Sequence, residues 1–305
     1  GTTDALTTGT WTEYDALGRV TSTSQDSELG ALVSLTTYGS GFTTTHTNPR
    51  THATTTSYMV YDEPSYDWPK AIVHPENART EIVRDVFGKP ETLTRRSADN
   101  SVIVTRAYGY DAHQRLCRSV EPETGATLVG YDAADNLVWS ASGLPAGTAC
   151  EASGTSPSVA ARKVSRVYGP TNLLTNLTFA DGRGNQSWGY TSDGLPQSIT
   201  TNNVNGGEQV VNGYGYNRRR MLTAETLTQP GLYGWSMAYA SNRNGAQSSI
   251  TYPSGLVVDY APNALGQPTQ AGSYASGVSH YPNGAIKQFT YGNGLVHEMT
   301  QNARQ

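Results

Sequence analysis

Aspartates recur along this chain at the start of the same short motif, in two copies with a glycine three residues later. They are Asp15, Asp62, Asp85, Asp111 and Asp132. General acid–base catalysis needs one carboxylate whose pKa is tuned to its task. A carboxylate that returns in successive copies of a motif is instead typical of a turn, where it accepts hydrogen bonds from the backbone just ahead. The pattern therefore predicts turn-capping aspartates and no catalytic carboxylate.

Other reactive side chains also fail to form a catalytic or ligand-binding pattern. The histidines never occur as His-Glu-x-x-His and never pair with a cysteine at zinc-binding spacing; they are His46, His52, His74, His113, His280 and His297. Ser254 lies in Tyr-Pro-Ser-Gly, which lacks the first glycine of a nucleophile elbow. No helix is expected after Gly213-Tyr214-Gly215, so this segment is not a phosphate loop. The sequence predicts no catalytic residue, no metal site and no cofactor.

The aspartate motif belongs to a repeat that runs through the whole chain. Its clearest copies are Tyr14-Asp15-Ala16-Leu17-Gly18-Arg19-Val20 and Tyr131-Asp132-Ala133-Ala134-Asp135-Asn136-Leu137. Most copies are separated by roughly 21–26 residues, and self-similarity at such a period marks a repeat array. We predict one array over residues 1–305, with about twelve units. The predicted structural anchors are Tyr14, Asp15, Gly18, Arg19, Tyr61, Asp62, Asp85, Gly88, Tyr110, Asp111, Tyr131, Asp132, Tyr190, Gly194, Tyr216, Tyr260, Gly266 and Tyr281.

Each unit is expected to contain two strands of about seven residues and two short turns. Sequential hairpins of this kind pair into one long antiparallel sheet. Helical spacing is nearly absent, and Gly and Pro interrupt the windows that could hold a helix. The predicted fold class is therefore all-β. In-out alternation is weak, as in 115–120, which favours a thin sheet with polar side chains on both faces and a ladder of tyrosines across the strands.

One larger gap between copies contains an insertion at about 141–160. The segment is rich in Gly, Ser, Ala and Pro, which predicts a surface loop. Cys150 lies in this insertion, and the other cysteine of the chain is Cys117 in the preceding repeat. Two interpretations stay open: a Cys117–Cys150 disulfide that ties the loop to the neighbouring hairpin, or two unpaired thiols.

Composition and charge exclude several classes of partner. Hydrophobic residues make up 36% of the chain and charged residues 15%, while 19 tyrosines supply most of the large apolar surface. The net charge of −4 predicts no nucleic-acid partner, and the basic run Arg218-Arg219-Arg220 is expected to be a solvated turn. No apolar stretch approaches the roughly 18 residues of a membrane-spanning helix.

These motifs resemble those of the YD-repeat family, also called RHS (rearrangement hotspot) repeats. The resemblance rests on the two copies quoted above and on the Tyr-Pro-x-Gly turns at 252–255 and 281–284, and it extends over essentially the whole chain. It implies a sheet that spirals into a hollow shell, which in bacterial members encloses a C-terminal toxin or effector. The implied partners are the remaining repeats and the cargo domain of a longer parent chain, and the implied location is secreted or cell-surface.

Two other functions are compatible with the residues. Exposed tryptophans in repeated positions can stack on sugar rings, which would make the chain a carbohydrate-binding or adhesion module. The candidates for this role are Trp11, Trp68, Trp139, Trp188 and Trp235. An uncapped array can also stack head to tail into an extracellular filament. The repeats, together with the lack of a catalytic pattern, favour a structural shell segment that encloses a cargo.

Overall fold

A computed structural model describes residues 9–60, 65–203 and 208–301. These residues form 24 strands and one helix of four residues. The predicted all-β fold is therefore confirmed. The predicted anchors Tyr61 and Asp62 lie outside the described residues.

The chain divides into two compact units. The first contains the described residues up to Val129 together with Ser142–Glu151, and the second contains Gly130–Ala141 and Ala152–Thr300. The strands that lie wholly or mainly in the first unit are β1 (Thr10–Tyr14), β2 (Val20–Gln25), β3 (Leu32–Gly39), β4 (Thr43–Thr47), β5 (Ala53–Tyr58), β6 (Pro69–Val73), β7 (Arg79–Arg84), β8 (Pro90–Arg96), β9 (Ile103–Tyr110), β10 (Leu116–Glu121) and β11 (Gly125–Tyr131).

The second unit contains the remaining elements. They are most of β12 (Leu137–Leu144), α1 (Pro157–Ala160), β13 (Lys163–Tyr168), β14 (Leu174–Phe179), β15 (Asn185–Tyr190), β16 (Pro196–Asn202), β17 (Gln209–Tyr216), β18 (Leu222–Gln229), β19 (Tyr233–Ser241), β20 (Gln247–Thr251), β21 (Val257–Asp259), β22 (Ala275–His280), β23 (Ile286–Tyr291) and β24 (Val296–Glu298). The insertion expected at about 141–160 thus begins inside β12 and holds the short helix α1. It is not a loop throughout.

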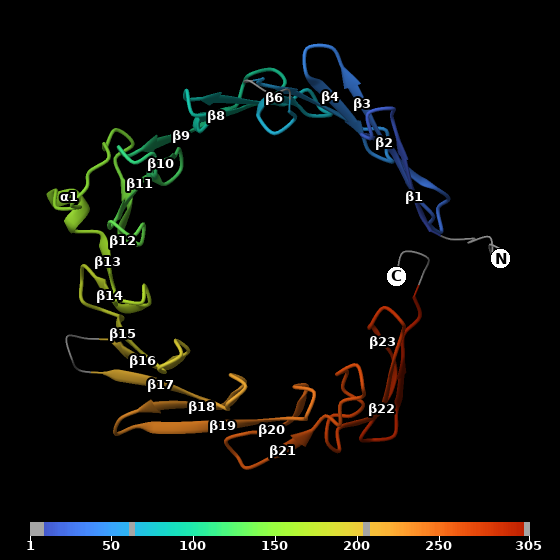
Figure 1. Cartoon of the computed structure of the whole chain (residues 1–305), viewed down its shortest axis with the longest axis vertical. Helices are drawn as coiled ribbons and strands as arrows, with labels where there is room; N and C mark the ends of the chain where they lie inside the picture. Colours follow the sequence, from blue (N-terminus) through green and yellow to red (C-terminus); the bar gives the residue numbers. More distant parts are fainter. Residues whose placement is uncertain (1–8, 61–64, 204–207, 302–305) are drawn as a thin grey trace. The chain divides into compact units, whose positions relative to one another are not determined.

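Sequence order and spatial order agree along the sheet. Strands β1 to β21 form one 21-stranded sheet, and β22 to β24 form a second, three-stranded one. From β13 to β21 each strand pairs antiparallel with the next one in the chain. Figure 1 shows β15 to β18 side by side in this order. Each hairpin pairs with the next because its connecting turn is too short for any other arrangement.

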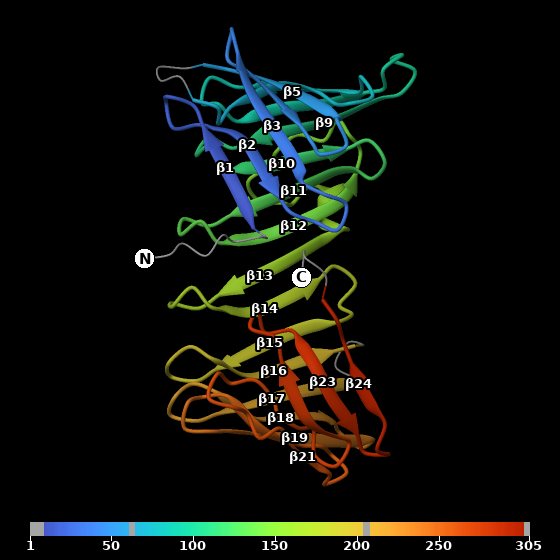
Figure 2. The same cartoon turned by 90° about the vertical axis from the view of Figure 1, so that its right-hand side faces the viewer.

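The two faces of the sheet in the second unit carry side chains of different size, whereas the sequence predicted polar side chains on both faces. Cross-strand partners on β15 to β19 form one row of mostly large, half-buried side chains and, beside it on the opposite face, one row of small ones; Figure 2 shows these strands stacked in order. The first row is Trp188, Ile199, Asn212, Leu227 and Trp235, and the second is Gly189, Ser198, Gly213, Thr226 and Ser236.

Bulges explain why the alternation is weak in the sequence. The pairing of β9 with β10 shifts register between Leu116 and Arg118, so that Cys117 interrupts the in-out pattern. Similar shifts occur at Tyr190 and Tyr216, where the strand enters its turn. One extra residue moves every following side chain to the other face of the strand. Simple counting along the sequence therefore loses the pattern at the strand ends.

Few side chains are fully buried, because most of the sheet has no second layer above it. Nine hydrophobic side chains are buried among the described residues, and eight of them lie between Cys117 and Val159. In the first unit the largest fully buried side chains are Leu128 and Leu144, with exposed fractions of 0% and 2%. In the second unit Val159 of α1 is fully buried. The insertion thus supplies the closest approach to a conventional hydrophobic core.

Replacing Leu128 by alanine should destabilise the chain, since the side chain is fully buried. We expect a loss of about 2–5 kcal/mol, the usual effect of a cavity left by a buried leucine. Leu17→Ala is the matched control, because Leu17 is 76% exposed and its loss should change stability by less than about 0.5 kcal/mol. Chemical denaturation followed by circular dichroism measures both. Equal losses for the two variants would contradict this description of the core.

Candidate functional site

A five-residue turn that follows the anchor tyrosine is the unit from which the array is built. In its first copy the Asp15 amide donates to the Arg19 carbonyl at 2.9 Å, and the Gly18 amide donates to the Asp15 carbonyl at 3.0 Å. The Asp15 carboxylate oxygen Oδ1 accepts from the amides of Leu17 and Arg19, both at 2.9 Å. One carboxylate therefore binds the backbone of the turn at two points. This is the turn-capping role that the residue spacing predicts.

The same backbone pattern recurs along the chain, and its first residue varies. An amide to carbonyl hydrogen bond closes each turn between its first and fifth residues, and the first side chain is Asp, Asn or Thr. These turns are Asp85–Lys89, Asp111–Arg115, Asp132–Asn136, Thr191–Leu195, Asn217–Met221, Asn242–Ala246 and Asn263–Gln267. An amide or hydroxyl oxygen can replace the carboxylate because the turn needs only an acceptor at that point.

Two predicted anchor tyrosines do not lie immediately before the first residue of a turn, as the other described anchor tyrosines do. Tyr260 lies three residues before its turn, which begins at Asn263. Tyr281 is itself the first residue of a turn, with its amide donating to the Ala285 carbonyl at 2.8 Å. A one-letter match in the motif therefore does not establish the same position in every copy.

The fourth residue of the turn adopts a left-handed backbone conformation. Gly18 has φ of 76°, and Gly88, Gly194 and Gly266 have values of 80–85°. Copies without glycine keep this conformation, as in Gln114 and Arg220, both at 64°. Thr51 in the turn Asn48–His52 also has φ of 64°, although a β-branched residue is unfavourable there. Hydrogen bonds of the turn hold these residues in place at a cost in backbone energy.

Four tyrosines, two of them predicted anchors, bind the backbone of the preceding strand with their hydroxyl groups. The Tyr110 hydroxyl donates to the Pro90 carbonyl at 2.9 Å, and the Tyr190 hydroxyl donates to the Leu174 carbonyl at 2.7 Å. Tyr38 and Tyr168 make equivalent bonds at 3.1 Å. Each accepting carbonyl belongs to the first residue of its strand. The expected tyrosine ladder is thus mainly a set of hydrogen bonds to the backbone, not a stack of rings.

Successive turns on this edge also contact one another. The Lys89 ammonium donates to the Gln114 carbonyl, and the Asn136 amide donates to Asn172 Oδ1 at 3.1 Å. Arg219 donates to the Arg243 carbonyl at 2.9 Å. These bridges join turns that lie about 24–36 residues apart in sequence.

Part of the basic run predicted to be solvated belongs to these bridges. Arg220 lies 3.5 Å from the Asp193 carboxylate and also donates to the Asp193 carbonyl at 3.2 Å, while Arg219 reaches the turn on the other side. The sequence could not show these contacts, because they depend on the spacing between adjacent hairpins.

The electrostatics of the turns favour ionised carboxylates. The Arg19 guanidinium donates to Asp15 and lowers the pKa of that carboxyl. In the turn Ser97–Val102, hydrogen bonds from the Ser97 hydroxyl and from the Ser101 amide and hydroxyl lower the pKa of Asp99 to about 2. A general acid needs the opposite shift of its pKa. These carboxylates act as acceptors in turns.

The first part of the insertion is tied to β10 in the first unit. Cys117 and Cys150 form a disulfide with a Cα–Cα distance of 5.6 Å, which is one of the two interpretations left open by the sequence. Arg118 donates to the Ala146 carbonyl close to this bridge. The bridge therefore holds the insertion against the hairpin of β9 and β10.

The second part of the insertion covers Trp139 in the second unit. The Trp139 indole is 3% exposed, and its Nε1 donates to the Ala152 carbonyl at 3.1 Å. A ligand therefore cannot stack on this ring. Trp11 is 47% exposed, whereas Trp68, Trp188 and Trp235 are half-buried. Burial thus excludes Trp139 from sugar stacking, and Trp11 is the most exposed of the five tryptophans considered for it.

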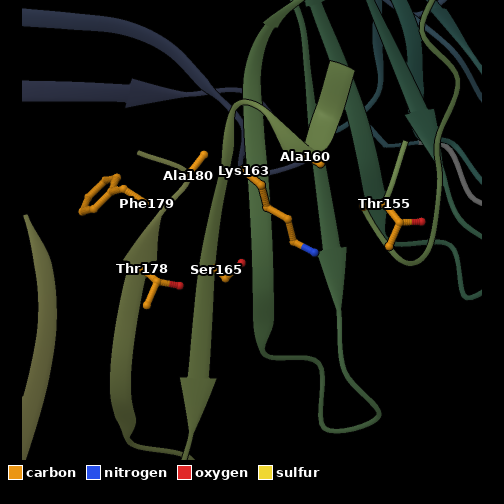
Figure 3. A pocket seen from close by; sticks show the side chains of 8 residues that line it. Thr155, Ala160, Lys163, Ser165, Thr178, Phe179 and Ala180 are labelled. Atoms are coloured by element: carbon orange, nitrogen blue, oxygen red, sulfur yellow. The ribbon is translucent and has the colours of Figure 1, made fainter. Parts of the chain in front are cut away.

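Each unit has a hollow on its described surface. The first unit has a groove of about 820 Å³ lined largely by apolar side chains, among them Phe42, Tyr58 and Ile82. The second unit has a smaller cavity of about 310 Å³ beside the insertion. Figure 3 shows Lys163 and Ser165 on β13, Thr178 on β14, and Thr155 in the loop that faces them. No sequence motif signalled this cavity, because it forms where the insertion meets two strands.

Within 9–60, 65–203 and 208–301, no group of three or more His, Cys, Asp or Glu side chains is placed to hold a metal ion. In the same part of the chain, no helix has the length and hydropathy needed to cross a membrane.

Comparison with solved structures reveals one informative relationship. A crystal structure of TcdB2-TccC3-Cdc42 matches 97% of this chain with a TM-score of 0.50 at 14% sequence identity. The chain shares its fold. It spans 19% of the length of that protein. Structures of TcdB2-TccC3 and TcdB2-TccC3-TEV each match 93% of the chain with a TM-score of 0.48 at 14% identity. No protein-family model and no curated protein matches the sequence.

Backbone strain at the fourth turn position predicts opposite effects for two substitutions. Gly18→Ala should destabilise the chain by about 1–2 kcal/mol, because alanine is unfavourable in the left-handed conformation even though nothing lies within 4 Å of the added carbon. Thr51→Gly should stabilise it by a similar amount, since glycine adopts a positive φ freely. Thermal unfolding of both variants checks the prediction. Shifts in the same direction would show that φ does not govern this turn.

The low pKa of Asp99 predicts an acid-dependent contribution to stability. A carboxyl whose pKa is depressed in the folded state stabilises the protein above its unfolded pKa of about 4 and loses this effect as the pH falls through about 2. Asp99→Asn keeps an acceptor but removes the charge. Wild type should therefore melt above the variant at pH 7, with the difference shrinking between pH 4 and pH 2. A difference that stays constant over this range would contradict the prediction.

Proposed function

We propose that this chain is a wall segment of an RHS-type shell that encloses a C-terminal toxin or effector domain of the same parent chain. The observation that best supports this proposal is the fold match. The chain forms a long antiparallel repeat sheet, 97% of the chain matches the structure of TcdB2-TccC3-Cdc42, and the chain spans 19% of that protein. The resemblance of the sequence to RHS repeats points in the same direction. The proposal includes a secreted or cell-surface location in bacteria.

The shallow burial of the sheet supports a role as a wall. A sheet with one apolar face must bury that face against another layer to form an ordinary domain. Here the large side chains of one face, such as Trp188, Leu227 and Trp235, are only half-buried. A wall segment has this property, since enclosed material and not its own second layer faces it.

We further propose that this segment has no catalytic role. The recurring carboxylates bind backbone amides of their own turns, which leaves them poorly suited to proton transfer. Among the described residues, the histidines do not join two other His, Cys, Asp or Glu side chains in a group that could hold a metal ion. Any activity of the parent chain is assigned to the cargo.

Electron cryomicroscopy of the intact parent protein tests the proposal. The expected result is a closed hollow body with this chain in its wall and additional density inside. Limited proteolysis of the same particle should leave the C-terminal cargo intact under conditions that digest the isolated cargo domain, which serves as the control. An open sheet, a solid rod or a filament would overturn the proposal, as would a cargo that is cut equally fast in both settings.

A further inference from the structure

The cavity beside the insertion has the residues of a small-ligand site that neither the repeats nor the proposed wall function requires. We propose that it binds a sugar acid, a monosaccharide that carries one carboxylate. Its volume of about 310 Å³ lies at the lower end of the range for small-molecule pockets, roughly 300–1,000 Å³, which suits a ligand with a single ring. The inference is independent of whether the chain forms a shell.

Lys163 supplies a fixed positive charge at this cavity. Its ammonium donates to the Ser153 carbonyl at 3.0 Å and lies 5.6 Å from the centre of the Trp139 ring. An ammonium has three donors, so the bond to Ser153 leaves two. Lys163 forms no ion pair with the carboxylates of the described residues. A ligand carboxylate fits this position because it provides both the opposite charge and the missing acceptors.

Two free hydroxyl groups lie on the same face of the sheet as Lys163. Ser165 is two residues further along β13, and Thr178 is its direct cross-strand partner on β14, so the three side chains share one face. Neither Ser165 nor Thr178 uses its hydroxyl in a hydrogen bond to another described residue. Thr155 brings a third hydroxyl from the loop (Figure 3), and this one is already hydrogen-bonded to the Ser153 hydroxyl at 2.9 Å. Hydroxyls both donate and accept, as the hydroxyls of a sugar require.

The remaining lining distinguishes a sugar acid from a simple anion. Ala160 and Ala180 add apolar surface at the cavity, which the C–H groups of a sugar ring can contact. The Phe179 side chain, which follows Thr178 on β14, lies on the other face of the sheet. Inorganic phosphate would use the charge of Lys163 and leave this apolar surface without a contact. A neutral sugar would hydrogen-bond to the hydroxyls but would leave the Lys163 ammonium without a negatively charged partner. The combination of one cation, several hydroxyls and an apolar border favours a ring with a single carboxylate.

Isothermal titration of the 305-residue chain with glucuronate, glucose and inorganic phosphate tests the proposal. Glucuronate should bind at least ten times more tightly than either glucose or phosphate. Lys163→Gln keeps a donor for the Ser153 carbonyl but removes the charge, and it should weaken glucuronate binding at least ten-fold. Lys70→Met is the control, because Lys70 lies at the groove of the other unit, and it should leave binding unchanged.

A second variant separates the ligand site from the fold. Ser165→Ala combined with Thr178→Val removes both free hydroxyls, and it should weaken glucuronate binding while the thermal unfolding midpoint stays within a few degrees of wild type. The proposal is overturned if wild type does not bind glucuronate, if phosphate binds as tightly as glucuronate, or if Lys70→Met weakens binding as much as Lys163→Gln. If the double variant loses binding because it unfolds, its melting curve will show this. The effect of Lys163→Gln on glucuronate binding then decides whether the proposal holds.

Discussion

Closure of the five-residue turn is the constraint on which the rest of the structure depends. A sheet with so few buried side chains gains little from a hydrophobic core, and its hairpins must be held in register by local hydrogen bonds. In the turns that begin with Asp or Asn, the side-chain oxygen of the first residue binds two amides that would otherwise point into the loop. The hydrogen bond between first and fifth residues then fixes where the next strand starts. Register along the sheet follows from turn geometry.

The anchor tyrosine extends this local order to the neighbouring hairpin. At Tyr38, Tyr110, Tyr168 and Tyr190 the hydroxyl binds the first carbonyl of the preceding strand, which ties the tyrosine to the base of the hairpin before it. Bridges such as Lys89 to Gln114 and Arg219 to Arg243 add side-chain links along the same edge. Each link is weak, because most of these groups are exposed to solvent. Their repetition along the edge makes the array stable through nearest-neighbour contacts, as in other repeat proteins.

The insertion differs from the rest of the array because it adds a second layer over part of the sheet. Where it covers the sheet, side chains become fully buried: Leu128 and Leu144 in the first unit, Trp139 and Val159 in the second. The disulfide and the Trp139–Ala152 hydrogen bond hold the covering segment in place. At its border the covering stops, and the exposed hydroxyl groups of β13 and β14 meet the loop to form the small cavity. A feature added to one repeat thus creates a local environment that the other repeats lack.

The sequence by itself determined the repeat, the all-β class, the order of hairpins and the capping role of Asp15, Asp111 and Asp132. These properties depend on residues within one turn or on adjacent strands. The repeat period of the sequence and the residue types in the turns are therefore enough to predict them. Tertiary structure alone decided which face carries the large side chains, how the tyrosine hydroxyls are used and which arginines bridge the turns. Bulges such as the one at Cys117 shift the alternation by one residue, and the bridges join turns about 24–36 residues apart. The cavity at Lys163 also needed the structure, because the residues that line it come from two strands and an insertion whose packing no local motif records.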